Sequence, residues 1–207
     1  DLPVLIMGET GTGKEVVARI VHEVSTRSKH AYVIVNAAAI PRELFESEMF
    51  GHEKGAFTGA SRQKMGYFED AHNGTMFLDE IGDLAPEHQA RMLRVIETGK
   101  FNRVGGTREI AVDVRIVSAT NRNLPSKDDG FRQDLFHRLS GFVITIPPLR
   151  NRADDVPELA NYFLSALQRP AAISKLSISD DAMEKLCSYT WPGNVRELKS
   201  CVERAAA

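Results

Sequence analysis

Short apolar runs alternate with longer segments of helical periodicity over the first 146 residues of the chain. Each run is almost wholly apolar, as expected for strands that are covered on both faces of a sheet. The alternation therefore predicts an α/β domain, in which helices lie on both faces of a parallel sheet. The expected strands are residues 4–7, 32–35, 75–78, 114–118 and 142–146.

The pattern changes at Pro147 and Pro148, after which only helical periodicity is found. Apolar residues recur at helical spacing in residues 159–167, for example. We therefore expect two domains, an α/β domain at residues 1–147 and a small all-α domain at residues 148–207. Helix starts are predicted at Ser179 and at residues 192–194.

Composition restricts the possible functions. The chain is 43% hydrophobic and 26% charged, which is typical of a soluble globular protein. A net charge of −2 gives no basic field of the kind that nucleic-acid binding requires, so we do not expect this chain to bind DNA by itself. Cys187 and Cys201 are not spaced as metal ligands, and they favour reduced thiols in the cytoplasm. Nothing in the sequence indicates a membrane span or a signal peptide.

A glycine-rich loop follows the first expected strand and opens a helix, which is the context of a P-loop. Glycines let the backbone curl so that its N–H groups point inward, and Lys14 adds a full positive charge for the terminal phosphates. The following helix carries its apolar positions on one side, Val16, Val17, Ile20, Val21 and Val24. The expected ATP contacts are Gly8, Glu9, Thr10, Gly11, Thr12, Gly13, Lys14, Glu15 and Val16.

One position departs from the usual P-loop. The Ser or Thr that commonly follows the lysine and ligates Mg²⁺ is Glu15 here. A carboxylate can hold a cation directly or through water, yet it also adds negative charge beside the phosphates. Glu15 as a magnesium ligand is therefore a hypothesis.

Two carboxylates, Asp79 and Glu80, follow the expected strand at residues 75–78. In a parallel sheet they emerge at the same carboxyl edge as the P-loop. Asp79 is expected to hold Mg²⁺, and Glu80 to orient and deprotonate the attacking water. Such a pair alone is more often a solvated strand end, but a P-loop upstream favours the catalytic interpretation.

With these motifs in place, the whole chain resembles the central AAA+ ATPase domain of sigma-54-dependent transcription activators, the bacterial enhancer-binding proteins of the nitrogen-regulator type. The most specific match is the GAFTGA motif at residues 55–60. The resemblance implies that this loop touches sigma-54, and that an all-α AAA+ lid follows the α/β domain. The alternative is a tight turn in which the phenylalanine packs inward. The matching residues are Gly55, Ala56, Phe57, Thr58, Gly59 and Ala60.

Further roles rest on the resemblance alone. Asn36 corresponds to a switch residue that holds Glu80 inactive, although an asparagine after a strand is more often a turn former. Thr120 and Asn121 correspond to the first sensor. Arg196, in the segment Trp-Pro-Gly-Asn-Val-Arg, corresponds to the second sensor, and residues 100–106 resemble a second pore loop.

Arg132 and Arg138 correspond to arginine fingers, which a neighbouring subunit presents to the phosphates. The alternative is a pair of surface arginines that bind Asp134 or Asp128.

The resemblance implies an ATPase that uses Mg²⁺, assembles as a hexameric or heptameric ring, and remodels the sigma-54 RNA polymerase holoenzyme so that the promoter opens. A nucleotide-binding module without remodelling activity is the alternative, and a motor acting on DNA is disfavoured by the net charge. Both ends of the sequence read as cut, so we expect a fragment. DNA binding is expected only through a C-terminal domain that this chain does not contain.

Overall fold

The computed structural model describes residues 2–124, 130–167 and 176–206. The described chain divides into two compact units. The first unit contains residues up to Met7 together with 15–144, and the second contains residues 8–14 together with 145–206. The phosphate loop thus groups with the C-terminal part of the chain.

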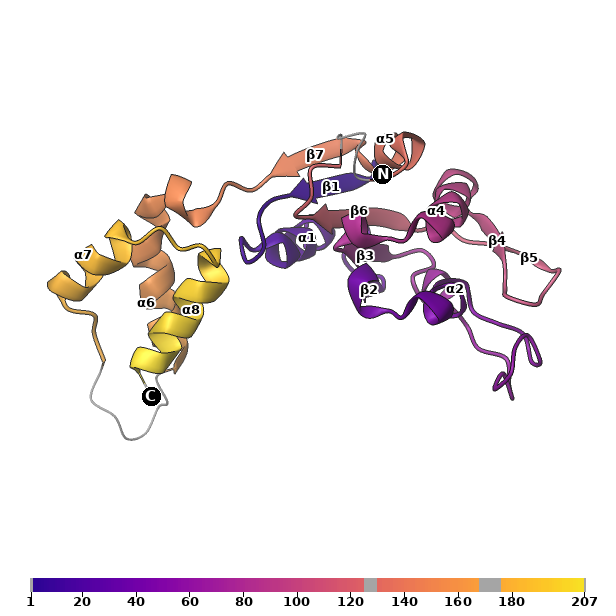
Figure 1. Cartoon of the computed structure of the whole chain (residues 1–207), viewed down its shortest axis with the longest axis horizontal. Helices are drawn as coiled ribbons and strands as arrows, with labels where there is room; N and C mark the ends of the chain where they lie inside the picture. The colour runs from indigo at the N-terminus through magenta and orange to yellow at the C-terminus, as the bar shows by residue number, and fades with distance from the viewer. Residues whose placement is uncertain (1, 125–129, 168–175, 207) are drawn as a thin grey trace. The chain divides into compact units, whose positions relative to one another are not determined.

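The first unit is built on a parallel sheet (Figure 1). Among the described residues, the sheet has five strands in the order β2-β3-β6-β1-β7. Its central strands are almost completely buried, which explains their apolar runs. The α/β prediction is confirmed, and each expected strand is present within two residues of its predicted ends. The strands are β1 (Val4–Met7), β2 (Tyr32–Asn36), β3 (Thr75–Asp79), β6 (Arg115–Thr120) and β7 (Phe142–Thr145).

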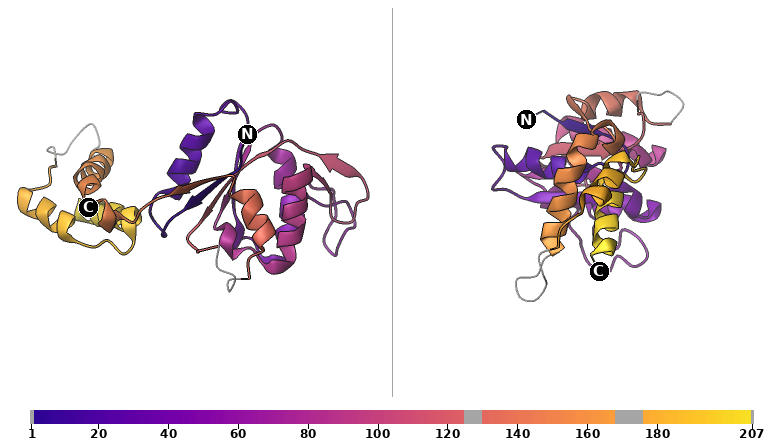
Figure 2. Two further views of the ribbon diagram at one scale, coloured as in Figure 1. Left: turned by 90° about the horizontal axis from the view of Figure 1, so that it is seen from above. Right: turned by 90° about the vertical axis from the view of Figure 1, so that its left-hand side faces the viewer.

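Helices lie on both faces of this sheet (Figure 2). Helix α1 (Lys14–Glu23) covers one face, whereas α4 (Pro86–Thr98) and α5 (Gln133–Leu139) cover the other. The main core forms where the sheet meets α4, α5 and α2 (Arg42–Phe50), and it also contacts the single turn α3 (Tyr67–Asp70). Its fully buried side chains include Phe50, Phe68, Met76, Leu78, Met92 and Leu135.

Much of the apolar side of α1 faces away from the sheet. Val16, Ile20 and Val24 are exposed by 62%, 50% and 80%. Ala18 and His22, on the opposite side of the helix, are buried instead. Helical periodicity therefore predicted the helix correctly but did not indicate which of its sides faces the sheet.

A small antiparallel hairpin was not expected from the sequence. It consists of β4 (Lys100–Asn102) and β5 (Glu109–Ala111), and it contains the whole segment that resembles a second pore loop. Each strand has three residues, which is too short for alternating apolar and polar positions to be recognised.

The C-terminal part of the second unit is helical, as expected. It contains α6 (Val156–Leu167), α7 (Asp180–Ser188) and α8 (Asn194–Ala205), preceded by the short turns η4 (Leu149–Asn151) and η5 (Ala153–Asp155). Ser179 caps α7 by accepting a hydrogen bond from the Ala182 N–H, as predicted. A separate core holds the helices together, with Leu149, Val156, Ala160, Trp191 and Leu198 at its centre.

Candidate functional site

The glycine-rich loop has the backbone of a phosphate cradle. Gly11 and Gly13 have φ angles of 81° and 103°, a region that other residues rarely adopt. The space around the Cα of Gly13 is open, so a ligand can approach the backbone there. The Thr12 hydroxyl donates to the carbonyl of Glu9 at 2.8 Å, and Nζ of Lys14 donates to the carbonyl of Gly8 at 3.0 Å.

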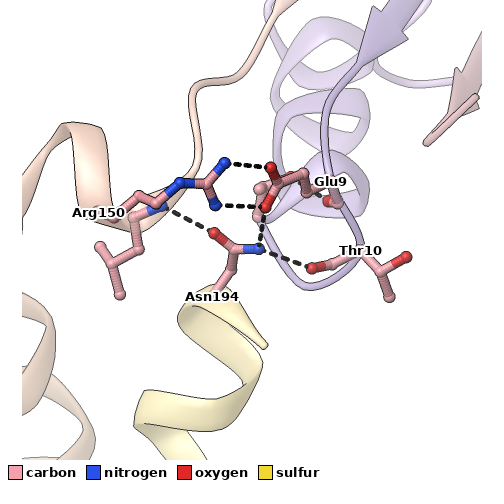
Figure 3. Close-up of polar contacts among 6 residues, drawn as sticks. Glu9, Thr10, Arg150 and Asn194 are labelled. Carbon is pink, nitrogen blue, oxygen red and sulfur yellow. Dashed lines mark hydrogen bonds and ion pairs between the residues drawn. The ribbon is translucent and has the colours of Figure 1, made fainter. Parts of the chain in front are cut away.

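The C-terminal helices contact this loop directly. Arg150 binds both carboxylate oxygens of Glu9, at 2.8 and 2.6 Å, and Asn194 donates to the same carboxylate at 3.2 Å (Figure 3). Together, first Arg150 and then Asn194 lower the pKa of Glu9 to about 2. The backbone N–H of Arg196 donates to the carbonyl of Gly11 at 3.2 Å. The structure thus brings the backbone of Arg196 to the phosphate loop, and the second-sensor role of its side chain stays a prediction.

In the first unit, the carboxyl edge of the sheet gathers several predicted site residues. Asn36 and Asp79 are register partners at the ends of β2 and β3. Thr120 ends β6, which pairs with β1 so that Thr120 lies beside Met7. Glu80 comes directly after Asp79 and has a left-handed conformation, with φ 51° and ψ 44°. Its N–H donates to the carboxylate of Asp79 at 3.0 Å. The parallel register therefore places the acidic pair and the Asn36 amide at one edge.

The Asn36 side chain also has a local structural role. Its Oδ1 accepts hydrogen bonds from the N–H groups of Ala38 and Ala39, at 3.0 and 3.1 Å, and so begins the turn η1 (Ala37–Ala39). This is the turn-forming role weighed against the switch role. Whether Asn36 also restrains Glu80 stays a prediction.

The first-sensor segment packs tightly behind the acidic pair. Thr120 is buried, and its hydroxyl accepts from the N–H of Arg122. A Cβ on Gly82 would approach that hydroxyl to 2.6 Å, so a larger residue at this turn would force neighbouring side chains to shift. Asn121 is exposed at the end of β6.

Arg132 lies just before α5, and Arg138 lies on the exposed side of that helix. Arg132 pairs with the carboxylate of Asp134 at 3.0 and 2.7 Å, which is one of the two surface pairings considered above. The other candidate partner, Asp128, lies outside the described residues. Nη2 of Arg138 is 3.5 Å from the carbonyl of Ile96. Both arginines are accessible, and their finger role stays a prediction.

The GAFTGA segment forms a loop between α2 and α3. Gly55 and Gly59 have φ angles of 83° and 103°, and the Gly55 N–H donates to the carbonyl of Ala60 at 2.8 Å, closing the loop at its base. Phe57 is 41% exposed, and its ring lies edge-on to the buried His52 ring, at 5.0 Å between ring centroids. Thr58 is exposed as well. The tip therefore presents an aromatic and a hydroxyl side chain rather than burying them.

A partly buried ion-pair group, which the sequence did not indicate, fixes the base of this loop. Arg103 lies in the turn between β4 and β5 and binds both oxygens of Glu69, at 2.9 and 2.5 Å, and one oxygen of Glu53 at 3.0 Å. The backbone adds hydrogen bonds from Glu53 to Val104 and from Val104 to Gly51. The GAFTGA loop and the hairpin turn are therefore held side by side (Figure 1).

The carboxylates of the candidate site could bind Mg²⁺ together with the phosphates of a nucleotide. Within the described ranges, no group of three His, Cys, Asp or Glu side chains could hold a metal by itself. Mg²⁺ is commonly held by one or two carboxylates, with phosphate oxygens and water as the other ligands. The half-buried Asp79 at a strand end suits that arrangement. Glu15 is exposed and lies 4.0 Å from Arg19 in the same helix.

Parallel strands in this order, a phosphate loop after β1, an acidic pair after β3 and a helical lid define an AAA+ nucleotide-binding fold. Family models agree with this class. Residues 1–145 match the sigma-54 interaction domain, and residues 150–207 match an AAA+ ATPase lid domain. The chain belongs to the sigma-54 interaction domain family.

Its relatives are transcription regulators. The chain is 52% identical over 205 residues to the Nif-specific regulatory protein of Azotobacter vinelandii, covering 98% of this chain and 39% of that protein. It is 53% identical over 209 residues to the DNA-binding transcriptional regulator NtrC of Azospirillum brasilense, covering 100% of this chain and 43% of that protein. The chain thus spans about two fifths of the length of these curated relatives.

Solved structures support the same fold. The structure of NtrX from Brucella abortus in complex with ATP is 42% identical, with a TM-score of 0.89, and covers 98% of this chain and 46% of that one. Hsp104 in a closed state is similar at 14% identity with a TM-score of 0.71, which shows the fold alone. No described helix is long and apolar enough to cross a membrane.

Proposed function

We propose that this chain is the ATP-hydrolysing module of a transcription activator that acts on the sigma-54 RNA polymerase holoenzyme. The observation that carries the proposal is the exposed GAFTGA tip, which belongs to the same sheet unit as β3, the strand that ends in Asp79 and is followed by Glu80. Membership of the sigma-54 interaction domain family supports the partner, and the ATP complex of the related NtrX supports the nucleotide.

The residues divide into chemical roles. Phosphoryl transfer depends on positioning and on charge neutralisation more than on covalent chemistry. The loop N–H groups and Lys14 would bind the phosphates, and Glu80 would accept a proton from the attacking water. Asn121 and Arg196 would contact the terminal phosphates. Mg²⁺, when bound, neutralises phosphate charge, and Asp79 would hold it, with Glu15 as a second candidate ligand.

Residues 1–147 would act as the nucleotide-binding domain and residues 148–207 as its lid. We place the module in the cytoplasm, where RNA polymerase acts, in a hexameric or heptameric ring. In a ring each subunit uses two different faces, so an arginine of one subunit can reach the nucleotide of the next. Arg132 and Arg138 are the candidates, and Arg132 would first have to leave Asp134. DNA binding would belong to a part of the protein outside this chain.

Mixing two inactive variants tests hydrolysis and ring assembly together. Glu80→Gln should reduce ATP turnover about 100-fold or more, because the general base is lost. Arg132→Ala should reduce it about 1000-fold if the arginine acts as a finger. In an equal mixture, about a quarter of the interfaces would combine an intact Glu80 with an intact Arg132 from the neighbour, so activity should return.

The control is Glu97→Gln, which removes an exposed carboxylate near the end of α4 and should leave turnover unchanged. The same mixture with Arg138→Ala tests the second candidate. If the single variants are inactive and the mixture stays inactive, Arg132 does not act between subunits. If Glu80→Gln retains full turnover, the assignment of the general base is wrong.

A further inference from the structure

The carbonyl groups on one side of the phosphate loop are held by the second unit's helical part. Three consecutive carbonyls, those of Thr10, Gly11 and Thr12, accept hydrogen bonds from Asn194, Arg196 and Arg152 in turn, at 3.1, 3.2 and 2.9 Å. In a trans peptide the C=O and the next N–H point in opposite directions. Holding these carbonyls therefore turns the N–H groups of Gly11 and Gly13 away from the helices.

The orientation of those N–H groups decides whether the loop can bind phosphate, because an anion is bound by several N–H groups that converge on it. A glycine-rich loop has many accessible conformations, and fixing one costs conformational entropy. Contacts that hold the loop in advance reduce the cost that binding would otherwise carry.

Asn194 is suited to this holding role. It is fully buried, and its φ of 53° is a conformation that asparagine tolerates better than most residues. Its Oδ1 accepts from the backbone N–H of Leu149 at 2.8 Å, and its Nδ2 donates to both Glu9 and Thr10 (Figure 3). Leu149 belongs to the core of the helical part, so that core fixes the amide.

Glu9 is the side chain through which the phosphate loop binds the helical part. Its carboxylate receives two hydrogen bonds from Arg150 and one from Asn194. The low pKa of about 2 means that it is ionised at any physiological pH. Gly11 fits closely beside these residues, since a Cβ there would lie 2.4 Å from the carbonyl of Gly193.

We propose that Glu9, Arg150 and Asn194 form a clamp, through which the helical part holds the phosphate loop in its binding conformation. The three are positioning residues, since their hydrogen bonds hold the loop rather than a phosphate. The inference rests on the proposed nucleotide-binding function. It adds that nucleotide affinity depends on side chains that do not contact the phosphates themselves.

A single variant and a double variant that restores the wild-type net charge test the clamp. Asn194→Asp keeps an oxygen for the Leu149 N–H but replaces two donated hydrogen bonds with repulsion toward Glu9. Affinity for ADP, measured by calorimetry well below the unfolding temperature, should fall about tenfold or more. Adding Glu9→Gln gives the side chain at position 9 an amide that can donate to the new carboxylate, and most of the lost affinity should return.

Glu203→Gln is the matched control, because it removes an exposed ion pair with Lys199 that lies on α8 away from the loop. A merely structural role predicts a lower unfolding temperature with an unchanged Kd for ADP at low temperature, and that result would overturn the clamp. A loss that Glu9→Gln does not restore in a folded double variant would also overturn it. If Asn194→Asp does not fold, Glu9→Gln and Arg150→Lys decide the question: weaker ADP binding supports the clamp, and unchanged binding contradicts it.

Failure of the proposed function is distinguishable. Wild-type chain that binds ADP and shows the variant pattern but hydrolyses no ATP would contradict the proposed activity while supporting the clamp. Wild-type chain that does not bind ADP at all would overturn both.

Discussion

Several residues at the proposed site also have a structural role. Asn36 caps a turn at the same edge of the sheet where Asp79 ends its strand, and Glu80 leaves that edge in a left-handed conformation. A left-handed conformation costs free energy in a residue other than glycine, of order 1–3 kcal/mol, and such positions cluster at functional sites. The left-handed backbone at Glu80 therefore fits a residue whose side-chain direction matters for function.

His22 gives a pH dependence that can be checked. It lies on the buried side of α1, and its Nδ1 is 3.0 Å from the hydroxyl of Thr75. Burial lowers its pKa below the ordinary value of 6.5. Because the folded-state pKa is the lower one, the contribution to stability is complete above about pH 6.5 and is lost as the pH falls.

We therefore expect the unfolding temperature to decrease between pH 7.5 and pH 5.5 more in the wild type than in His22→Asn, in which the amide can still bond to Thr75. Circular dichroism at a series of pH values measures the difference. Parallel pH profiles for the two proteins would show that His22 does not titrate in this way.

Among secondary-structure elements, those with long or strongly apolar sequences were predictable. The strands of the main sheet were found because strands buried on both faces must be apolar throughout. The hairpin β4–β5 was missed because its strands have three residues each. The outward stripe of α1 was not recognised because periodicity gives the side of a helix, not the surface that this side meets.

Contacts between distant segments were the least predictable part of the site. The phosphate loop, the acidic pair and the GAFTGA loop are continuous motifs, so the sequence indicates them directly. Glu9 meets Arg150 and Asn194 across 141 and 185 positions, and no spacing rule connects them. The one usable signal was Asn194 after a glycine, since asparagine tolerates left-handed backbone conformations.

Arg103 is expected to stabilise the pairing of the two loops. Its side chain is 13% exposed and that of Glu69 is 9% exposed, so Arg103→Met would leave a buried carboxylate without its main partner. We expect a loss of about 2 kcal/mol in unfolding free energy, hence a fall of about 5 °C in the unfolding temperature.

The control for Arg103 is Lys64→Met, which removes an ion pair that is 47% and 26% exposed at the same loop base. Exposed pairs contribute about 0–1 kcal/mol, so its effect should be clearly smaller. Equal effects of the two substitutions would mean that burial of the Arg103 group adds nothing.

Taken as a whole, the chain is proposed to combine nucleotide turnover at the carboxyl edge of the sheet with partner recognition at the GAFTGA tip. Phe57 and Thr58 project from a loop whose glycines allow large backbone changes and whose base is fixed by Arg103. The tip can therefore change conformation while its base stays attached to the sheet unit.

The measurement that tests this most directly is binding of the chain to purified sigma-54 in the presence of ADP and aluminium fluoride, a mimic of the transferred phosphoryl group. Gel filtration should show a stable complex with the mimic and none without nucleotide. Thr58→Ala should abolish the complex while ATP turnover stays within about twofold of the wild type, because the surface hydroxyl lies outside the hydrolytic residues. Absence of a complex for wild-type chain that hydrolyses ATP, or equal loss of turnover and binding in Thr58→Ala, would contradict the account.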